Sequence, residues 1–185
     1  MIETPRLVLR LWQESDREPF AALNADAEVM RYFPSTLTRA GSDDLVDRIE
    51  RHYERHGFTV YAAERKDSGE FIGFIGLAVP EWEAYFTPCV EIGWRLAAKH
   101  WNQGLATEGA RAALGYGFGV LGLREIVSFA VVGNTASRRV MEKIGMRYDG
   151  EFDHPRLPEG HALRRHVLYR ATNSHECTRI KGLEQ

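Results

Sequence analysis

The chain has 185 residues, of which 44% are hydrophobic, 11% aromatic and 27% charged, which is the size and composition of one globular domain. Lys and Arg number 24 against 26 Asp and Glu, and the formal net charge of -2 excludes a polyanion-binding surface over the whole protein, so any anion site must be local. Two cysteines, Cys89 and Cys177, give neither a metal-ligand spacing nor a disulfide framework. We therefore expect a cytoplasmic protein.

Targeting signals are not expected either. The N-terminus shows no basic segment followed by an apolar one. The most apolar run, 71–79, is much shorter than the ~20 residues that cross a bilayer. We expect no membrane partner.

The first third of the chain predicts one strand and two helices. Leucines at every second position of 7–11 predict a strand with one buried face. Ser15 or Asp16 is a suitable cap for the helix that follows. Apolar residues four apart then predict a helix over 42–56, ended by Gly57.

A hairpin and an aromatic loop come next. The runs 58–65 and 71–79 flank a charged turn that contains Gly69, which predicts two antiparallel strands. The loop 81–87 carries three aromatic side chains. Two interpretations remain open for it, a loop that lines a substrate and a flap that packs over the core.

The second half alternates strands with helices. We expect strands at 89–96, 124–132 and 161–170, and helices at 103–120 and 134–144. This order predicts an α/β or α+β domain with a mixed sheet. Residues 1–171 are expected to form a single domain, and 172–185 a polar, flexible tail.

The segment 101–108 has the features of a local anion site. It follows an expected strand and opens directly into a helical pattern. The first N–H groups of a helix have no internal partner, and Gly104 and Ala106 would let a phosphate approach them. The Lys-Ser or Lys-Thr pair of a Walker loop is absent. The alternative is the plain start of a helix.

Gly93 lies inside the preceding strand, where a glycine usually marks a bulge or a close approach to the backbone. A bulge would free backbone N–H groups for an extended amide ligand or for an oxyanion. Relief of crowding against the next helix is the other interpretation.

The segment 134–146 predicts a helix with clear boundaries. Asn134 is a suitable N-cap and Gly145 a suitable stop. The expected apolar stripe comprises Ala136, Val140 and Ile144. Ser137 lies off that stripe, so its hydroxyl either faces a cleft or bonds a backbone carbonyl.

In this order and spacing, four motifs resemble the GNAT superfamily of acetyl-CoA-dependent N-acetyltransferases, and its RimJ/RimL-like branch in particular. The motifs are Thr4-Pro5-Arg6-Leu7-Val8-Leu9-Arg10, Glu91-Ile92-Gly93-Trp94, Trp101-Asn102-Gln103-Gly104-Leu105-Ala106-Thr107-Glu108, and Asn134-x-x-Ser137 with Lys143-Ile144-Gly145-Met146. The resemblance spans residues 4–170. It implies a central, mostly antiparallel mixed sheet flanked by helices, with an acyl-CoA cleft at a splayed strand pair.

The resemblance also implies a cofactor site. The family's pyrophosphate loop, Q/R-x-x-G-x-G/A, maps onto 101–106, with Trp101 at its first position. Asn134 would contact the pantetheine side, and Arg138 or Arg139 the adenosine phosphates, unless those arginines only form a solvated helix face. The other implied acetyl-CoA contacts are Trp94, Arg95, Leu96, Gln103, Gly104, Leu105, Ala106 and Thr107.

Catalytic residues follow from the same resemblance. The tyrosine that often protonates the leaving thiolate is replaced by Met141, and the serine proposed as the acid in the RimJ/RimL-like branch maps onto Ser137. Glu91 is the nearest carboxylate to the expected acetyl end and the candidate base; the alternative for Glu91 is a cross-strand ion pair with an arginine. Three histidines are further candidate bases, and we expect no metal site; these are His154, His161 and His166.

One glycine motif is rejected. Residues 117–122 spell G-x-G-x-x-G, but they end a helical pattern and precede a strand, whereas a dinucleotide fold needs the reverse order.

The expected activity is transfer of acetyl from acetyl-CoA to a primary amine by direct attack, the amine being a protein N-terminus, such as that of a ribosomal protein, or a small molecule. We expect a monomer or homodimer with no nucleic-acid partner. The alternatives are a non-catalytic acyl-CoA-binding regulatory module and a nucleotide-binding protein that uses the Gly104 loop.

Overall fold

The computed structural model describes residues 1–173, and its centre is one sheet of eight strands in the order β1-β2-β3-β4-β5-β6-β8-β7. The strands are β1 (Ile2–Glu3), β2 (Leu7–Arg10), β3 (Val60–Arg65), β4 (Phe71–Ala78), β5 (Glu91–Leu96), β6 (Glu125–Val131), β7 (Arg147–Asp153) and β8 (Arg165–Thr172). Every neighbouring pair is antiparallel except β5 and β6, which are parallel. The expected mixed, mostly antiparallel sheet is confirmed.

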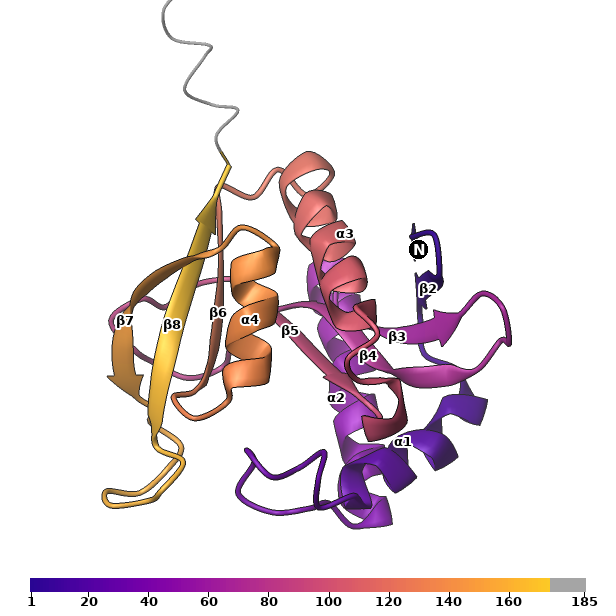
Figure 1. The fold of residues 1–185 in the computed structure, drawn as a ribbon, viewed down its shortest axis with the longest axis horizontal. Coiled ribbons are helices and arrows are strands. Elements are labelled where there is room, and N and C mark those ends of the chain that lie inside the picture. The colour runs from indigo at the N-terminus through magenta and orange to yellow at the C-terminus, as the bar shows by residue number, and fades with distance from the viewer. Residues whose placement is uncertain (174–185) are drawn as a thin grey trace, which may run out of the picture.

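Helices cover both faces of this sheet (Figure 1). They are α1 (Arg17–Ala25), α2 (Arg39–His56), α3 (Leu105–Gly119) and α4 (Thr135–Lys143), with short 3-10 turns at Glu14–Asp16 and Ala98–His100. Helices α3 and α4 bury Leu105 and Met141 in one core with Ile92 of the sheet. Helices α1 and α2 bury Phe20 and Val46 in a second core on the other face.

Strands β5 and β6 separate along their length. Strand β5 pairs with β4 from Glu91 to Leu96, but with β6 the registered pair is Glu91 with Val127. Figure 1 shows the two strands diverging toward their C-terminal ends. Because α3 and α4 begin just beyond those ends, both helix N-termini lie at the open end of this strand pair.

Most expected elements are present, with shifted ends. The hairpin of β3 and β4 is confirmed, and Gly57 ends α2 in the left-handed conformation with φ 74. The expected helix over 42–56 begins earlier, at Arg39, because the Thr38 hydroxyl caps it by accepting a 3.1 Å bond from the Gly41 N–H. Leu11 is outside β2 and 46% exposed, which corrects the expected strand over 7–11.

The last third differs more from expectation. Strand β7 was not predicted, because in its polar sequence only Phe152 is buried and β7 is an edge strand. Thr172 pairs with Glu125 inside the sheet, which moves the expected tail boundary beyond it. Residues 174–185 of that tail lie outside the described residues.

Candidate active site

The start of α3 leaves backbone donors available. Gly104 is its N-cap, in the left-handed conformation with φ 77, and no side chain caps the helix there. Leu105 is buried and fixes the first turn against the core, while Ala106 and Thr107 are partly exposed beside it. The first N–H groups of α3 therefore have no side-chain cap, an arrangement that suits an anion.

Two side chains of the loop before α3 hold its shape. The indole N–H of Trp101 donates a 2.8 Å bond to the Leu96 carbonyl, so Trp101 anchors the loop to the end of β5. The side-chain amide of Gln103 donates a 2.9 Å bond to the Lys99 carbonyl. Gln103 thus contributes through its backbone position, because its side chain is turned back along the chain.

The expected bulge at Gly93 is wrong. Gly93 pairs with Gly76 in an uninterrupted register between β4 and β5. Free backbone groups on β5 come instead from its separation from β6. The Val90 and Ile92 carbonyls point toward β6, where they accept bonds of 2.9 Å from the Val127 N–H and the Ser128 hydroxyl.

Main-chain groups alternate between the two edges of a strand, so those of Trp94 and Leu96 also face the β6 side, beyond the point where the pairing ends. This edge is suited to an extended amide ligand. The Trp94 side chain packs with the α3 core.

Arg95 extends to the other side of the sheet. Its guanidinium donates a 2.6 Å bond to Asn24 Oδ1 and lies 4.1 Å from the Phe33 ring and 5.3 Å from the Phe74 ring. Its Nε is buried without a hydrogen-bond partner within residues 1–173, and burial lowers its pKa to about 10. The Arg95 side chain therefore lies against α1 and the α1–α2 segment, away from the start of α3.

Asn134 and Ser137 lie together at the start of α4. Asn134 Oδ1 accepts a 3.2 Å bond from the Ser137 N–H and so caps the helix. The buried stripe of α4 contains Met141 and Ile144, whereas Ala136 is exposed, which corrects the expected stripe. Ser137 precedes Met141 by one helical turn, so it lies on the face turned toward the sheet. Within residues 1–173 its hydroxyl has no hydrogen-bond partner.

The Arg138 side chain lies away from the start of α3. Its Nη1 donates a 3.2 Å bond to the Val132 carbonyl. Its pKa is raised chiefly by Tyr169, with weaker effects from Glu142 and Tyr148, which places the guanidinium over β7 and β8. The structure does not bring this side chain to the Gly104 loop.

Glu91 is a carboxylate without a charged partner. Its side chain shares a face with Val127, opposite the face covered by α3 and α4. Burial is the cause that raises its pKa to about 8, and no lysine, arginine or histidine within residues 1–173 pairs with it. The alternative of a cross-strand ion pair is therefore wrong, and Glu91 has the basicity that suits proton transfer near neutral pH.

Two of the three histidines form part of an aromatic cluster on the Glu91 face. The rings of His154 and His166 lie 5.0 Å apart, and Trp82 lies 4.8 Å from His154. Burial is the main cause that lowers the pKa of His154 to about 4 and also lowers that of His166. Both are neutral at pH 7 and are weak bases. His161 accepts a 3.1 Å backbone bond from Leu163 in the turn before β8.

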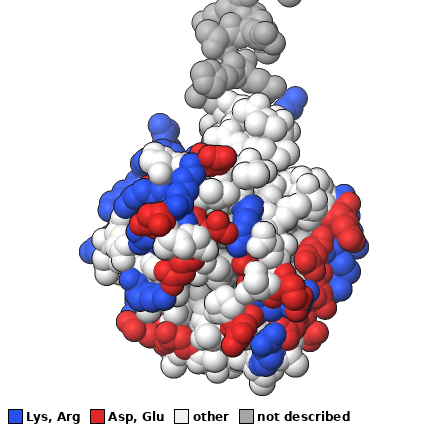
Figure 2. Space-filling view, turned by 90° about the vertical axis from the view of Figure 1, so that its right-hand side faces the viewer, with Lys and Arg blue, Asp and Glu red and all other residues white. Residues whose placement is uncertain are grey.

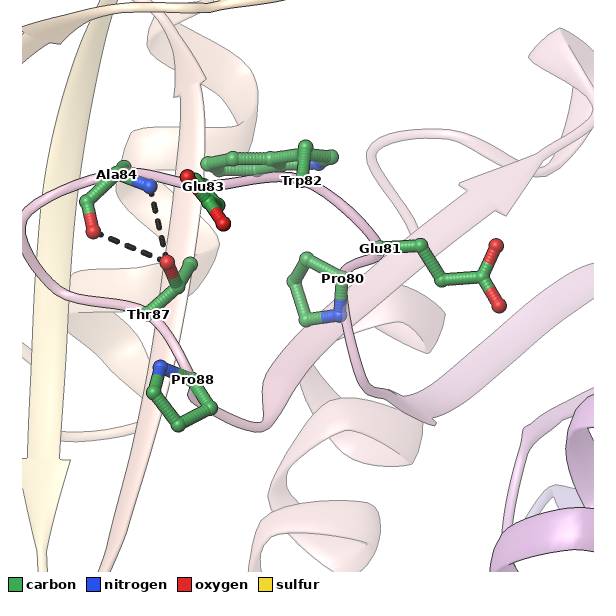
Figure 3. Close-up of a pocket in the computed structure, with 7 residues that line it drawn as sticks. All are labelled: Pro80, Glu81, Trp82, Glu83, Ala84, Thr87 and Pro88. Atoms are coloured by element: carbon green, nitrogen blue, oxygen red, sulfur yellow. Dashed lines mark hydrogen bonds between the residues drawn. The ribbon is translucent and has the colours of Figure 1, made fainter.

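The aromatic loop after β4 packs onto this cluster. Phe86 is buried, and Trp82 stacks on Phe152, so the interpretation as a flap over the core is confirmed for these side chains. Figure 3 shows the residues of this loop that line an open cavity, with the Thr87 hydroxyl bridging the N–H and carbonyl of Ala84. This cavity measures about 520 Å³ and is lined by Trp82, Glu81 and Glu83 among others.

Charge is interleaved rather than segregated. Figure 2 shows acidic and basic side chains side by side on the face that it presents. No group of three or more metal-ligating side chains occurs within residues 1–173. Over the same residues, no helix has the length and apolarity needed to cross a membrane.

Comparisons with known proteins agree with this geometry. Residues 6–147 match the family model for the acetyltransferase (GNAT) domain. The chain is 35% identical over 146 residues to YkkB of Bacillus subtilis, covering 78% of this chain and 84% of the relative. It is 31% identical over 157 residues to the N-acetyltransferase YoaA of the same organism, covering 81% of this chain and 84% of the relative.

A solved structure has the same fold. The GNAT-family acetyltransferase from Bacillus anthracis superimposes with a TM-score of 0.76 at 29% identity, over 92% of this chain and 97% of the other. The chain therefore belongs to the GNAT family of acetyltransferases, enzymes that take their acetyl group from acetyl-CoA.

Proposed function

We propose that this enzyme is a RimJ/RimL-like N-acetyltransferase that acetylates a primary amine by direct attack, and that residues 1–171, extended by Thr172, act as one catalytic domain. The observation that carries the proposal is the opening between β5 and β6. Ser137 of α4 lies on one side of it and Glu91 of β5 on the other. A donor and an acceptor that approach from opposite faces of the sheet meet there.

The donor side is built from main-chain groups and one amide. The backbone of Trp94 and the N–H of Leu96 would pair with the amide-bearing pantetheine arm, since the Leu96 carbonyl already accepts the Trp101 indole N–H, and Asn134 would contact the same arm. The N–H groups that begin α3, from Gly104 to Thr107, would hold the pyrophosphate. Arg95 and Arg138 take no part in this site, because their side chains point elsewhere, the Arg95 backbone pairs with β4 and the Arg138 N–H bonds to the Asn134 carbonyl.

The acceptor side holds the base. Glu91 accepts one proton from the protonated amine, directly or through a water, and the freed nitrogen lone pair attacks the thioester carbonyl carbon. The C–N bond forms and the C–S bond breaks. The attacking nitrogen releases its second proton to solvent as the neutral amide forms, and Ser137 passes a proton to the departing sulfur and regains one from solvent. Bound acetyl-CoA supplies the activated acyl group.

The basicity of Glu91 favours a weakly basic amine. A carboxylate with a pKa of about 8 matches the N-terminal amine of a protein, at about 8, better than a lysine, at about 10.4. A protein N-terminus is therefore the favoured acceptor, and a small primary amine is the second candidate. We propose a cytoplasmic enzyme that acts as a monomer or homodimer.

Two measurements test the proposal. Thermal unfolding with and without acetyl-CoA reports binding, because a ligand at 100 times its Kd adds about 2.7 kcal/mol of stability. Thiol release with N-terminal peptides, lysine side-chain analogues and small amines reports turnover and acceptor class. A shift without turnover on any amine would favour the non-catalytic acyl-CoA-binding module. A larger shift with ATP than with CoA would favour the nucleotide-binding alternative.

A further inference from the structure

Arg6, in the turn between β1 and β2, is bound to the first turns of α3. Its backbone N–H and its Nε donate bonds of 2.8 and 2.7 Å to the two carboxylate oxygens of Glu108. The Thr4 hydroxyl donates a 2.6 Å bond to the same carboxylate. Residues 102 positions apart in the sequence thus form one charge-assisted network beside the Gly104 loop.

The same arginine fixes the peptide that precedes the α3 N-cap. Arg6 Nη1 donates a 2.9 Å bond to the Gln103 carbonyl. In a planar trans peptide the carbonyl and the next N–H point in opposite directions. With the Gln103 carbonyl held toward Arg6, the N–H of Gly104 is directed away from Arg6, on the side where a phosphate would meet the start of α3. Gly104 is close to the guanidinium, since a Cβ there would lie 3.5 Å from Arg6 Nη2.

Glu108 explains why a cation is needed at this place. Burial opposes its ionisation, but hydrogen bonds from Thr4 and Arg6 outweigh burial and lower its pKa, so Glu108 is an anion at neutral pH. An uncompensated carboxylate in the first turns of α3 would repel a phosphate at that helix N-terminus. Arg6 supplies the compensating charge.

The network borders an open cavity. This cavity, of about 550 Å³, lies between the β1–β2 turn and α3, and Arg111 and Lys143 add two further cations to its lining. The guanidinium of Arg111 donates a 2.7 Å bond to the Lys143 carbonyl and so joins α3 to α4 at this cavity.

We propose that Arg6 is a positioning residue for the phosphate end of acetyl-CoA, acting by orienting the Gln103–Gly104 peptide and by neutralising Glu108. The inference rests on the proposed cofactor site at α3. It assigns the phosphate-end function to an N-terminal residue, in place of the Arg138 side chain, which the structure directs to β7 and β8.

Calorimetric titration of CoA into four variants tests this role without any acceptor. The variants are Arg6→Gln, Glu108→Gln, the double variant, and Arg39→Gln as a control. Arg39 also pairs with one acidic residue, Asp43, but on α2. Arg6→Gln is expected to weaken CoA binding about tenfold or more, and the double variant to regain part of that loss because the repelling charge is gone. Arg39→Gln should bind CoA as the wild type does.

A second ligand and a second variant separate positioning from folding. Competition with pantetheine, which lacks the pyrophosphate, should show the same affinity in wild type and Arg6→Gln. Arg6→Lys keeps the charge but lacks the guanidinium geometry that bonds Glu108 and Gln103 together. It replaces Arg6→Gln if that variant does not fold, and it should bind CoA more weakly than the wild type.

Three results would overturn the inference: unchanged CoA affinity in Arg6→Gln, a double variant no tighter than Arg6→Gln, or equal losses for CoA and pantetheine. Failure of the wild type to bind CoA would instead overturn the proposed function.

Discussion

The carboxylate of Glu91 lies beside Gly93. Oε1 of Glu91 is 3.8 Å from the position that a Cβ atom would take at Gly93. Gly93 therefore leaves space beside the carboxylate, on the way from the paired end of β5 to the end where it separates from β6. The proposed base is thus buried enough to have a raised pKa, and no side chain at position 93 lies against its carboxylate.

Replacement of Glu91 by Gln should lower kcat/KM by about 100-fold or more, because the amide cannot accept the proton of the attacking amine. In the wild type kcat/KM should rise with pH through about 8, since the carboxylate must be ionised to act as a base. The pH-rate profile of both proteins is the measurement. Glu83→Gln, on the exposed loop after β4, is the matched control; a wild-type profile in Glu91→Gln would exclude Glu91 as the base.

Ser137→Ala should lower kcat by about 10- to 100-fold while the acetyl-CoA affinity is nearly unchanged, because only the hydroxyl on the sheet-facing side of α4 is removed. Steady-state kinetics together with calorimetric titration separate the two parameters. Thr135→Ala, on the exposed side of the same helix turn, should leave both unchanged. Unaltered kcat in Ser137→Ala would remove Ser137 from the mechanism.

Asn134→Ala should lower the free energy of unfolding by about 1 kcal/mol, because the Ser137 N–H loses its capping acceptor. Asn134→Asp keeps an acceptor oxygen at the N-cap and should retain the stability. Urea denaturation of the three proteins gives the comparison. If both variants lose the same stability, capping is not the reason.

The contribution of His52 to the stability of the folded protein should be lost as pH drops below about 6.5. Its Nε2 accepts a 2.9 Å bond from the Val79 N–H, while its Nδ1 lies 2.9 Å from the Phe58 carbonyl, so the neutral ring satisfies both. Burial, with a smaller contribution from His56, lowers the pKa of His52 below its usual 6.5. As pH falls, His52 of the unfolded chain therefore binds a proton before His52 of the folded protein does. The contribution of His52 to the free energy of unfolding is complete only above a pH of about 6.5.

Urea midpoints at about pH 7.5 and about pH 5.5 test this, with His52→Gln expected to show a smaller difference between the two than the wild type. His154 and His166, whose pKa values are also lowered, change the stability in the same direction as His52, whereas Glu91, whose pKa is raised, changes it in the opposite direction in both proteins. An equal difference between the two urea midpoints in the wild type and in His52→Gln would contradict the assignment to His52.

Substitution by alanine should have different effects on stability at two glycines of α3. Gly115 has open space where a Cβ would stand, so Gly115→Ala should stabilise the protein by about 0.5–1 kcal/mol through helix propensity. At Gly117 the Cβ would lie 2.5 Å from Ile126 Cδ1 and 3.0 Å from Leu77 Cδ1, in the core. Gly117→Ala should therefore gain nothing or lose stability in thermal unfolding.

The sequence predicted the regular elements that have a strong local pattern. The β3–β4 hairpin, α2 with its Gly57 end, and the glycine start of α3 are all encoded by spacing and turn residues close in the chain. Strand β7 was missed because an edge strand needs apolar residues on one face only. In β7 the buried residue is Phe152, which is too weak a pattern to predict a strand. The stripe of α4 was misassigned because Ala136 is apolar yet exposed.

The order of the predicted elements indicated a mixed α/β fold, and four motifs that resemble the GNAT family indicated an acetyltransferase with a glycine loop at the start of a helix. Which side chains meet was decided only in three dimensions. The separation of β5 from β6, the unpaired state of Glu91 and the Arg6–Glu108 network depend on partners far apart in the chain. Local propensity carries no information on such contacts, because they exist only after the sheet has brought its strands together.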